Sequence, residues 1–302
     1  MTLTELRYVV TLAEERHFGR AAERCFVSQP SLSAAVKHLE DELDTKLFER
    51  GKGDVLLTAA GERVVAQARR VLDEAERVKG VARAARNPLI GTLRLGVIHT
   101  VAPYLLPELI AALRSLAPAM PLDVEENLTG NLDPMLRAGQ IDAAIVALPF
   151  QAPGIATATL YEESFRVIVP SGHRWARRKQ IAADELASEN LMLLNIGHCF
   201  RDQVLEACQE FARPAPAGRH GNSLETIRSM VASGLGVSVM PATAITPRFA
   251  NPLVRAIDFE PPVPTRRIVL AYREGFARMA VVRLIGKAIH KADLPVVPLA
   301  VV

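Results

Sequence analysis

The 302-residue sequence predicts a small all-α domain at the N-terminus, a long linker helix and an α/β domain of two lobes. Three observations lead to this prediction. Apolar residues recur at helical spacing through residues 1–58, and they continue at alternating steps of four and three through residues 59–88. After Thr92, short apolar runs alternate with helical stretches. The chain is also too long for one ordinary core, so several domains are expected.

The first domain, residues 1–58, contains three predicted helices. The first helix ends near Arg16, and a short second helix runs from about Gly19 to Cys25. Ser28 is suited to cap the third helix. Pro30 fits the first turn of that helix, where its missing N–H costs nothing. The order of helix, short helix, tight turn and helix is the plan of a helix-turn-helix domain.

The third predicted helix has a polar outer face that suits the reading of DNA. The residues on or beside this face are Gln29, Pro30, Ser31, Ser33 and Lys37. Glutamine pairs with adenine, serine with several bases, and lysine with phosphate or guanine. Residues 46–57 predict a short ribbon, on which Arg50 and Lys52 would contact phosphates as a wing. Three helices alone would fit a small protein-interaction domain equally well.

The linker helix, residues 59–88, is expected to begin after the cap residue Thr58 and to stop at Asn87-Pro88. Its apolar residues are Val64, Ala68, Val71, Ala75, Val78 and Ala82. This spacing is that of a coiled-coil seam and predicts a dimer. The alternative is an ordinary amphipathic helix packed on its own domain.

Residues 89–302 are expected to form parallel sheets covered by helices, in two lobes with a cleft between them. The expected boundaries are about 89–162 and 267–302 for lobe I, and about 163–266 for lobe II. Strands are predicted at Leu93–Ile98, Leu122–Glu126, Ile141–Ala147, Phe165–Val169, Leu191–Leu194, Val237–Met240 and Arg267–Tyr272. Helices are predicted at Leu105–Leu116, Phe200–Phe211 and Leu224–Ser233.

The composition is that of an ordinary globular protein, with 49% apolar and 23% charged residues. No apolar stretch approaches the roughly 20 residues that cross a bilayer, so no membrane association is expected. No secretion signal is visible, and a cytoplasmic location is expected. The net charge of +3 does not by itself indicate nucleic acid, and no cofactor or metal is expected.

Three cysteines are too few for a disulfide framework, which raises the question of thiol chemistry. Cys199 is expected at a helix N-terminus, where free N–H groups favour a thiolate, and His198 and Arg201 would add positive charge. Cys208 lies nine positions later, roughly 13 Å away along a helix, whereas a disulfide needs Cα atoms within about 7 Å. A bond between them would therefore require the helix to unwind.

The alternative for these residues is that they are buried and inert, which is the interpretation favoured for Cys25. A zinc site at Cys199, Cys208 and His198 is disfavoured because no closely spaced cysteine pair is present.

Several motifs resemble the N-terminal signature of LysR-type regulators. They are Phe18-Gly19-Arg20-Ala21-Ala22, Ser28-Gln29-Pro30-Ser31-Leu32-Ser33, Leu39-Glu40, Leu47-Phe48-Glu49-Arg50 and Leu57-Thr58-Ala59-Ala60-Gly61. The resemblance covers the whole chain and implies a winged helix-turn-helix domain, a linker helix and a lobed domain similar to periplasmic binding proteins. It also implies an operator DNA partner, a dimer of dimers and, as a further candidate partner, RNA polymerase.

The segment around Cys199 is similar to the peroxide-sensing OxyR subfamily of that family. The matching stretches include Gly197-His198-Cys199, Arg201-Asp202-Gln203, Cys208 and Ser223-Leu224-Glu225-Thr226. The resemblance implies an activator in which hydrogen peroxide oxidises Cys199, which Cys208 then resolves as a disulfide. Other implied residues of the site are Thr100, Thr129, His198, Gln203 and Arg266, with Arg267 as the alternative to Arg266. Relatives often have a histidine where this chain has Gly218, with His220 nearby.

Two other functions remain open at this point. A LysR-type regulator could bind a small organic effector, with the cysteines incidental. A thiol peroxidase would need a second catalytic motif, which the sequence does not show, and the chain is therefore not expected to be an enzyme.

Overall fold

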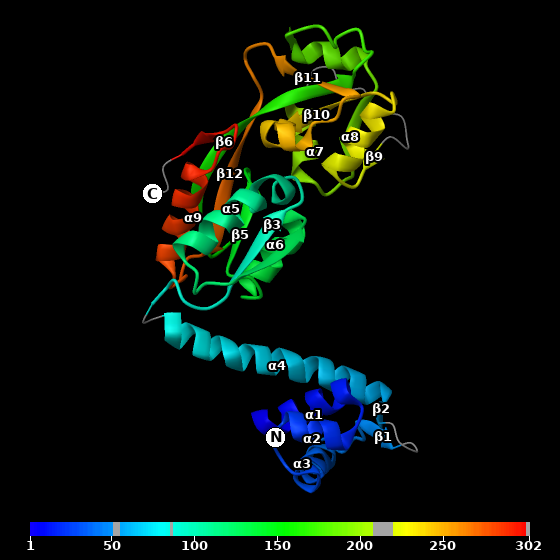
Figure 1. Ribbon diagram of the computed structural model, residues 1–302, viewed down its shortest axis with the longest axis vertical. Coiled ribbons are helices and arrows are strands. Elements are labelled where there is room, and N and C mark those ends of the chain that lie inside the picture. The colour runs from blue at the N-terminus through cyan, green and yellow to red at the C-terminus, as the bar shows by residue number, and fades with distance from the viewer. Residues whose placement is uncertain (51–54, 85–86, 208–219, 300–302) are drawn as a thin grey trace. The chain divides into compact units, whose positions relative to one another are not determined.

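The computed structural model describes residues 1–50, 55–84, 87–207 and 220–299. These residues form two compact units, Met1–Arg83 and Ala84–Val302 (Figure 1). The described residues do not include Lys52, Cys208 or Gly218, nor the side chains of Arg50 and Ala82. Within the described parts, no helix is long and apolar enough to span a bilayer.

The first unit is a three-helix core followed by a ribbon and a long helix. Its elements are α1 (Leu3–Glu15), α2 (Phe18–Arg24), α3 (Gln29–Glu42), β1 (Phe48–Arg50), β2 (Val55–Leu57) and α4 (Ala59–Ala84). Strands β1 and β2 pair antiparallel as the predicted ribbon. The predicted caps are present: the Ser28 hydroxyl accepts from Ser31 N, and the Thr58 hydroxyl accepts from Gly61 N at 2.8 Å.

Helix α4 uses its apolar residues in two different ways. Val65 and Ala68 are buried in the core of the first unit, with Val64 packed beside them. This first part therefore packs on its own domain, as the alternative interpretation of the linker has it. Farther along, Val71 and Val78 are exposed, Val78 to 68%. Dimerisation through these later residues stays a prediction.

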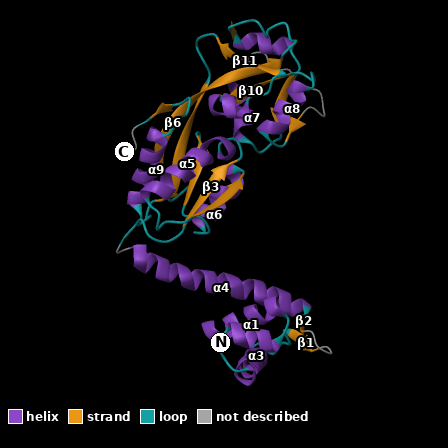
Figure 2. Ribbon diagram, viewed as in Figure 1, coloured by secondary structure: helices purple, strands orange, loops and turns teal. Residues whose placement is uncertain are grey.

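The second unit contains a mixed sheet with helices on its faces (Figure 2). In lobe I the sheet order is β4, β3, β5, β12 and β6. The bounds are β3 (Leu93–Ile98), β4 (Leu122–Asn127), β5 (Ala143–Ala147), β6 (Ile155–Pro170) and β12 (Thr265–Arg273). Helices α5 (Ala102–Leu116), α6 (Thr129–Arg137) and α9 (Met279–Lys291) cover it, and the short strand β13 (Val297–Pro298) pairs with β6. Because crossover connections are right-handed, α5 and α6 lie on opposite faces.

Lobe II is built on the second half of β6, which pairs with β10 (Val237–Pro241) and β11 (Val254–Phe259). Its other elements are β7 (Gln180–Ile181), β8 (Leu191–Leu194), α7 (Cys199–Ala207), β9 (His220–Gly221) and α8 (Leu224–Ala232). Three short 3₁₀ helices, Ala183–Ser188, Ala242–Ile245 and Pro247–Phe249, complete it. Each lobe has its own apolar core.

The expectation of parallel sheets is confirmed for β3 with β4 and β5 but is wrong for the strands that connect the lobes. Strand β12 runs antiparallel to β5, and β6 runs antiparallel to both β10 and β12. The predicted strand Phe165–Val169 is only the end of β6, which continues from lobe I into lobe II. The sequence pattern marked only the end of the strand, which is apolar apart from Arg166, because polar residues interrupt residues 155–164.

Candidate functional site

Cys199 is the first residue of α7 and lies where the two lobes meet. Its side chain is partly buried and packs against the apolar core of lobe I, although α7 belongs to lobe II. The hydroxyl of Thr129, the first residue of α6 in lobe I, donates to the Cys199 sulfur at 3.9 Å. The first residues of two helices, one from each lobe, therefore meet at this sulfur.

A small cavity of about 10 Å³ adjoins the Cys199 sulfur. Its lining residues are Ile98, His99, Thr100, Asn127, Leu128, Thr129, Gly197, His198 and Cys199. This volume is near that needed for one water molecule, so the cavity suits a molecule of about that size with hydrogen-bonding groups. Four of the residues singled out from the sequence, Thr100, Thr129, His198 and Cys199, meet here.

Arg266 is completely buried next to this cavity. Its guanidinium donates to the Thr100 hydroxyl at 2.8 Å and to the Thr100 carbonyl oxygen at 3.0 Å. It also forms an ion pair with Glu163 at 2.6 Å, with both side chains fully buried, and lies 4.8 Å from the centre of the Phe200 ring. Arg266 therefore reaches the cavity lining through Thr100, and Glu163 balances its charge.

Arg267, the alternative candidate, lies outside the cavity. Its side chain is about half exposed, and it pairs with Glu162 at 3.4 Å. The alternation of side chains along β12 explains the difference, because neighbouring residues of a strand point to opposite faces.

His198 is buried, and burial lowers the pKa of its imidazole, with the neighbouring His99 adding to the effect. The rings of His99 and His198 lie 5.6 Å apart. This direction favours the neutral form of His198 over the positive charge expected from the sequence, and its part in the site stays a prediction. Arg201 donates to the carbonyl oxygen of Leu194, which holds its guanidinium at the end of β8.

His99 and Glu126 were not singled out from the sequence. His99 Nδ1 lies 3.1 Å from a carboxylate oxygen of Glu126, across neighbouring parallel strands. The only sequence signal for His99 is its position beside Thr100, after a strand.

Gln203 does not line this cavity. Its amide donates to the carbonyl oxygen of Leu148 at 2.7 Å, and it lines a separate pocket of about 630 Å³. That pocket lies between residues 148–151 of lobe I, α7, and residues 264–267. Gln203 lies one helical turn beyond Cys199 along α7, and its hydrogen bond to Leu148 holds its amide at this second pocket.

The DNA-reading face expected from the sequence is presented on α3. Gln29, Pro30, Ser31 and Lys37 are exposed, and Ser33 is partly buried. The Ser31 hydroxyl lies 2.7 Å from the Ser28 hydroxyl, so part of its hydrogen-bonding capacity is used within the helix start.

The ribbon after α3 is anchored by Glu40. This buried carboxylate accepts from the backbone N–H groups of Leu47 and Phe48 and from the Lys46 ammonium. Burial alone would raise the pKa of Glu40, but these hydrogen bonds lower it. At Gly61, a Cβ would collide with the carbonyl oxygen of Leu47. The two contacts give a structural reason for Leu39-Glu40 and the closing glycine of the N-terminal motifs.

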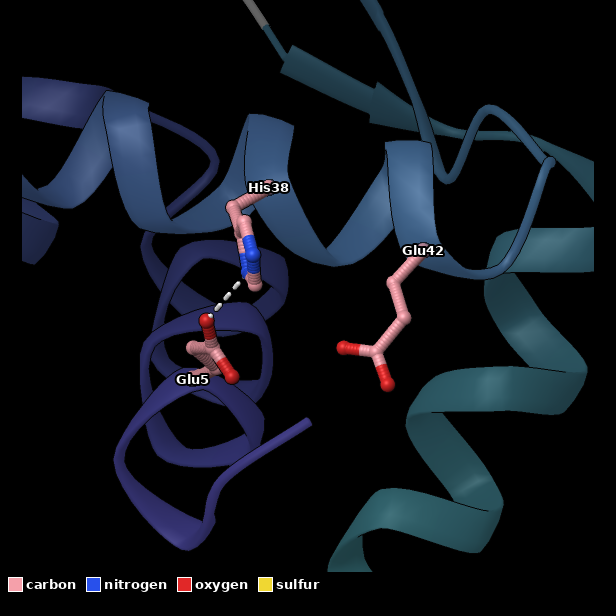
Figure 3. A group of neighbouring side chains, drawn as sticks. All are labelled: Glu5, His38 and Glu42. Carbon is pink, nitrogen blue, oxygen red and sulfur yellow. Dashed lines mark hydrogen bonds and ion pairs between the residues drawn. The ribbon is translucent and has the colours of Figure 1, made fainter.

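Glu5, His38 and Glu42 form the one group of possible metal ligands found among the described residues (Figure 3). Both carboxylates already have partners. Glu5 accepts from His38 Nδ1 at 2.7 Å and from the Thr2 backbone, and Glu42 pairs with the Met1 ammonium. These contacts connect α1 to α3 without requiring a metal.

Family models match most of the chain. Residues 3–62 match the model of the bacterial regulatory helix-turn-helix protein of the lysR family, and residues 86–292 match the LysR substrate binding domain. A hydrogen peroxide-inducible genes activator from Pectobacterium carotovorum is 38% identical over 275 residues, 91% of each chain. The DNA-binding transcriptional dual regulator OxyR of Escherichia coli K12 is 39% identical, over 91% of this chain and 90% of its own.

Solved structures of similar proteins cover nearly the whole chain. A full-length OxyR variant from Pseudomonas aeruginosa is 48% identical, with a TM-score of 0.64, over 97% of this chain and 99% of its own. A Corynebacterium glutamicum OxyR variant bound to H2O2 is 35% identical, with a TM-score of 0.69, over 96% of this chain and 92% of its own.

Proposed function

The chain belongs to the LysR family of bacterial helix-turn-helix regulators, within its OxyR subfamily, and we propose on that basis that hydrogen peroxide is the signal it detects. The observation that carries the proposal is the position of Cys199. Its sulfur lies at a helix N-terminus, next to the Thr129 hydroxyl, and adjoins a cavity of about 10 Å³. Such a site suits a small hydrogen-bonding oxidant.

In the proposed reaction, the Cys199 thiolate attacks one oxygen of hydrogen peroxide and the O–O bond breaks. The sulfur gains a hydroxyl group as sulfenic acid, and the leaving hydroxide takes up a proton to become water. The hydroxyls of Thr100 and Thr129 hold the peroxide. Arg266 fixes Thr100 by donating to its hydroxyl oxygen, so the Thr100 O–H remains available to donate.

The second proposed step is attack of the Cys208 thiol on the sulfenic acid, which forms a disulfide and releases water. Helix α7 is continuous from Cys199 to Ala207, so α7 must unwind before the two cysteines come within bonding distance. Removing Cys199 from its packing against lobe I would loosen the contact between the lobes. We propose that this change reaches α3 through α4 and alters the contacts with the operator in a dimer of dimers.

Mass spectrometry of the thiols before and after one equivalent of peroxide tests this function. The expected product of the wild-type protein is a Cys199–Cys208 disulfide, whereas Cys208→Ser is expected to stop at sulfenic acid. Cys199→Ser should abolish the response and keep reduced-state DNA binding. A Cys199→Ser variant that still responds to peroxide would rule out this thiol as the sensor.

A second candidate is a regulator that binds a small organic effector. The pocket of about 630 Å³ beside Gln203 favours it, because this volume is in the range of small-molecule sites. The two functions differ in one measurement: oxidation that leaves operator binding and transcription unchanged would support the effector and contradict peroxide sensing.

A further inference from the structure

We propose that His99, held by Glu126, supplies the proton to the hydroxide that leaves when Cys199 reacts with peroxide. The inference rests on the proposed function and adds a residue to it. An attack on peroxide releases a strongly basic hydroxide, so a positioned proton donor accelerates the step.

The lining of the cavity leaves few groups that could donate this proton. Among the described residues that line it, three have side chains that titrate: His99, His198 and Cys199. Cys199 is the nucleophile. His198 is only 8% exposed and is held towards its neutral form by burial. Nearby Arg266 is paired with Glu163 and does not deprotonate, and the threonine hydroxyls are too weakly acidic.

His99 combines access to the cavity with access to solvent. Its side chain is 34% exposed, so it can take up protons from water after each reaction. Its Nδ1 lies 3.1 Å from a carboxylate oxygen of Glu126, and this contact fixes the ring. The proton on Nε2 is then the one available for transfer. Parallel strands β3 and β4 place the two residues together, because the strands end at the same edge of the sheet.

Atoms and electrons balance in this step. The Cys199 thiolate forms an S–O bond and loses two electrons to peroxide, and the O–O bond breaks. The departing oxygen takes the Nε2 proton of His99 and leaves as water. Neutral His99 then recovers its proton from solvent.

The test compares two reactions of the same thiol in the full-length reduced protein. Oxidation by hydrogen peroxide needs the thiolate and a proton for the leaving group. Alkylation by iodoacetamide needs only the thiolate, because iodide leaves without a proton. In His99→Gln, the peroxide rate constant is expected to fall by about 100-fold, the lower end of the usual contribution of a proton donor, with alkylation within about twofold of wild type.

Two further variants complete the design. Glu126→Gln should lower the peroxide rate constant selectively but less, since the ring loses its orienting partner. His290→Gln, an exposed histidine on α9, is the matched control and should change neither rate. Free imidazole should restore peroxide oxidation in His99→Ala and leave alkylation unchanged.

Equal losses in both reactions would mean that His99 acts on the thiolate or on folding, which overturns the inference. Unchanged rates in His99→Gln overturn it as well. If wild-type Cys199 alkylates normally but resists peroxide, the proposed function fails, and the inference with it. If peroxide oxidises the wild-type protein normally and His99→Gln shows no selective loss, the inference alone fails and the proposed function stands.

Discussion

The hydroxyl of Thr129 points at the sulfur of Cys199, although the two residues begin helices in different lobes and lie far apart in the sequence. The sulfur thus belongs to lobe II, while lobe I supplies its hydrogen-bond donor and the apolar side chains that pack against it. A chemical change at this atom alters the contact between the lobes directly, which makes it a suitable place for a sensor.

Replacing Thr129 with valine keeps the shape of the side chain and removes its donor. The expected result is peroxide oxidation of Cys199 slowed by about tenfold, the effect of losing about 1.4 kcal/mol of hydrogen bonding in the transition state. Stopped-flow oxidation of the reduced protein measures this. Thr157→Val, on the exposed surface of β6, serves as the control. Equal rates for wild type and Thr129→Val would show that the hydroxyl does not contribute.

His198 is expected to make the stability of the protein depend on pH. Since burial lowers the folded-state pKa of His198 below its ordinary value of 6.5, the unfolded chain binds more protons as the pH falls below 6.5. The stability contributed by neutral His198 is therefore present above pH 6.5 and is lost as the pH falls through the folded pKa. Denaturant unfolding at several pH values should show this slope reduced in His198→Gln. If stability depends on pH equally in wild type and His198→Gln, His198 is not the group responsible.

Arg278 provides a way to separate sensing from output. Its guanidinium donates to the carbonyl oxygens of Pro88, Ile90, Gly91 and Thr92, which fastens the segment after the linker helix to the start of α9. We expect Arg278→Gln to leave the rate of Cys199 oxidation unchanged but to reduce the difference between reduced and oxidised footprints on the operator.

Arg273→Gln is the matched control for this experiment. Arg273 also donates to backbone carbonyls, those of Leu136 and Ile141, but inside lobe I. Arg273→Gln should lower the stability of lobe I but keep the difference between reduced and oxidised footprints. If both variants lose the difference, general destabilisation explains it, and Arg278 has no special part in coupling.

Phe26 lies in the turn between α2 and α3, the helix that is expected to read DNA. Its φ is +57°, and the hydrogen bonds Phe26 N to Glu23 O and Val27 N to Ala22 O form a Schellman ending of α2. The ring is 95% exposed, so it contributes little to the core. Phe26→Gly should raise the unfolding free energy of the DNA-binding unit by about 1 kcal/mol, because glycine adopts this conformation without strain. If Phe26→Ala stabilises as much, relief of backbone strain is not the cause.

Helix α3 is expected to recognise the operator through individual side chains. Gln29→Ala and Ser33→Ala should relax the preference at individual base pairs, by about 1–3 kcal/mol for a lost base contact. Lys52→Ala should instead weaken binding to all sequences and lower the slope against salt by about one. Binding titrations at several salt concentrations, on operator and scrambled DNA, distinguish the two effects. If Gln29→Ala and Ser33→Ala still distinguish operator from scrambled DNA as well as the wild type does, other residues contact the bases.

The sequence by itself determined the elements that local rules govern. Strands Leu93–Ile98 and Leu191–Leu194 were predicted at their observed bounds, because short segments dominated by apolar residues mark buried strands. Ser28 and Thr58 were recognised as caps because a hydroxyl before a helix binds N–H groups only a few residues away. Thr100, Thr129 and Cys199 were predicted as site residues from their places after strands and from the motifs around them.

Tertiary structure alone decided how distant residues complete the site. The pairing of Arg266 with Glu163 and Thr100 depends on strands β6 and β12 passing between the lobes. The contact of His99 with Glu126 depends on the register of β3 and β4. Gln203 bonds to the Leu148 carbonyl oxygen of lobe I and does not line the cavity beside Cys199. None of these contacts can be predicted from a short stretch of sequence, since each results from packing between segments that meet only in the folded chain.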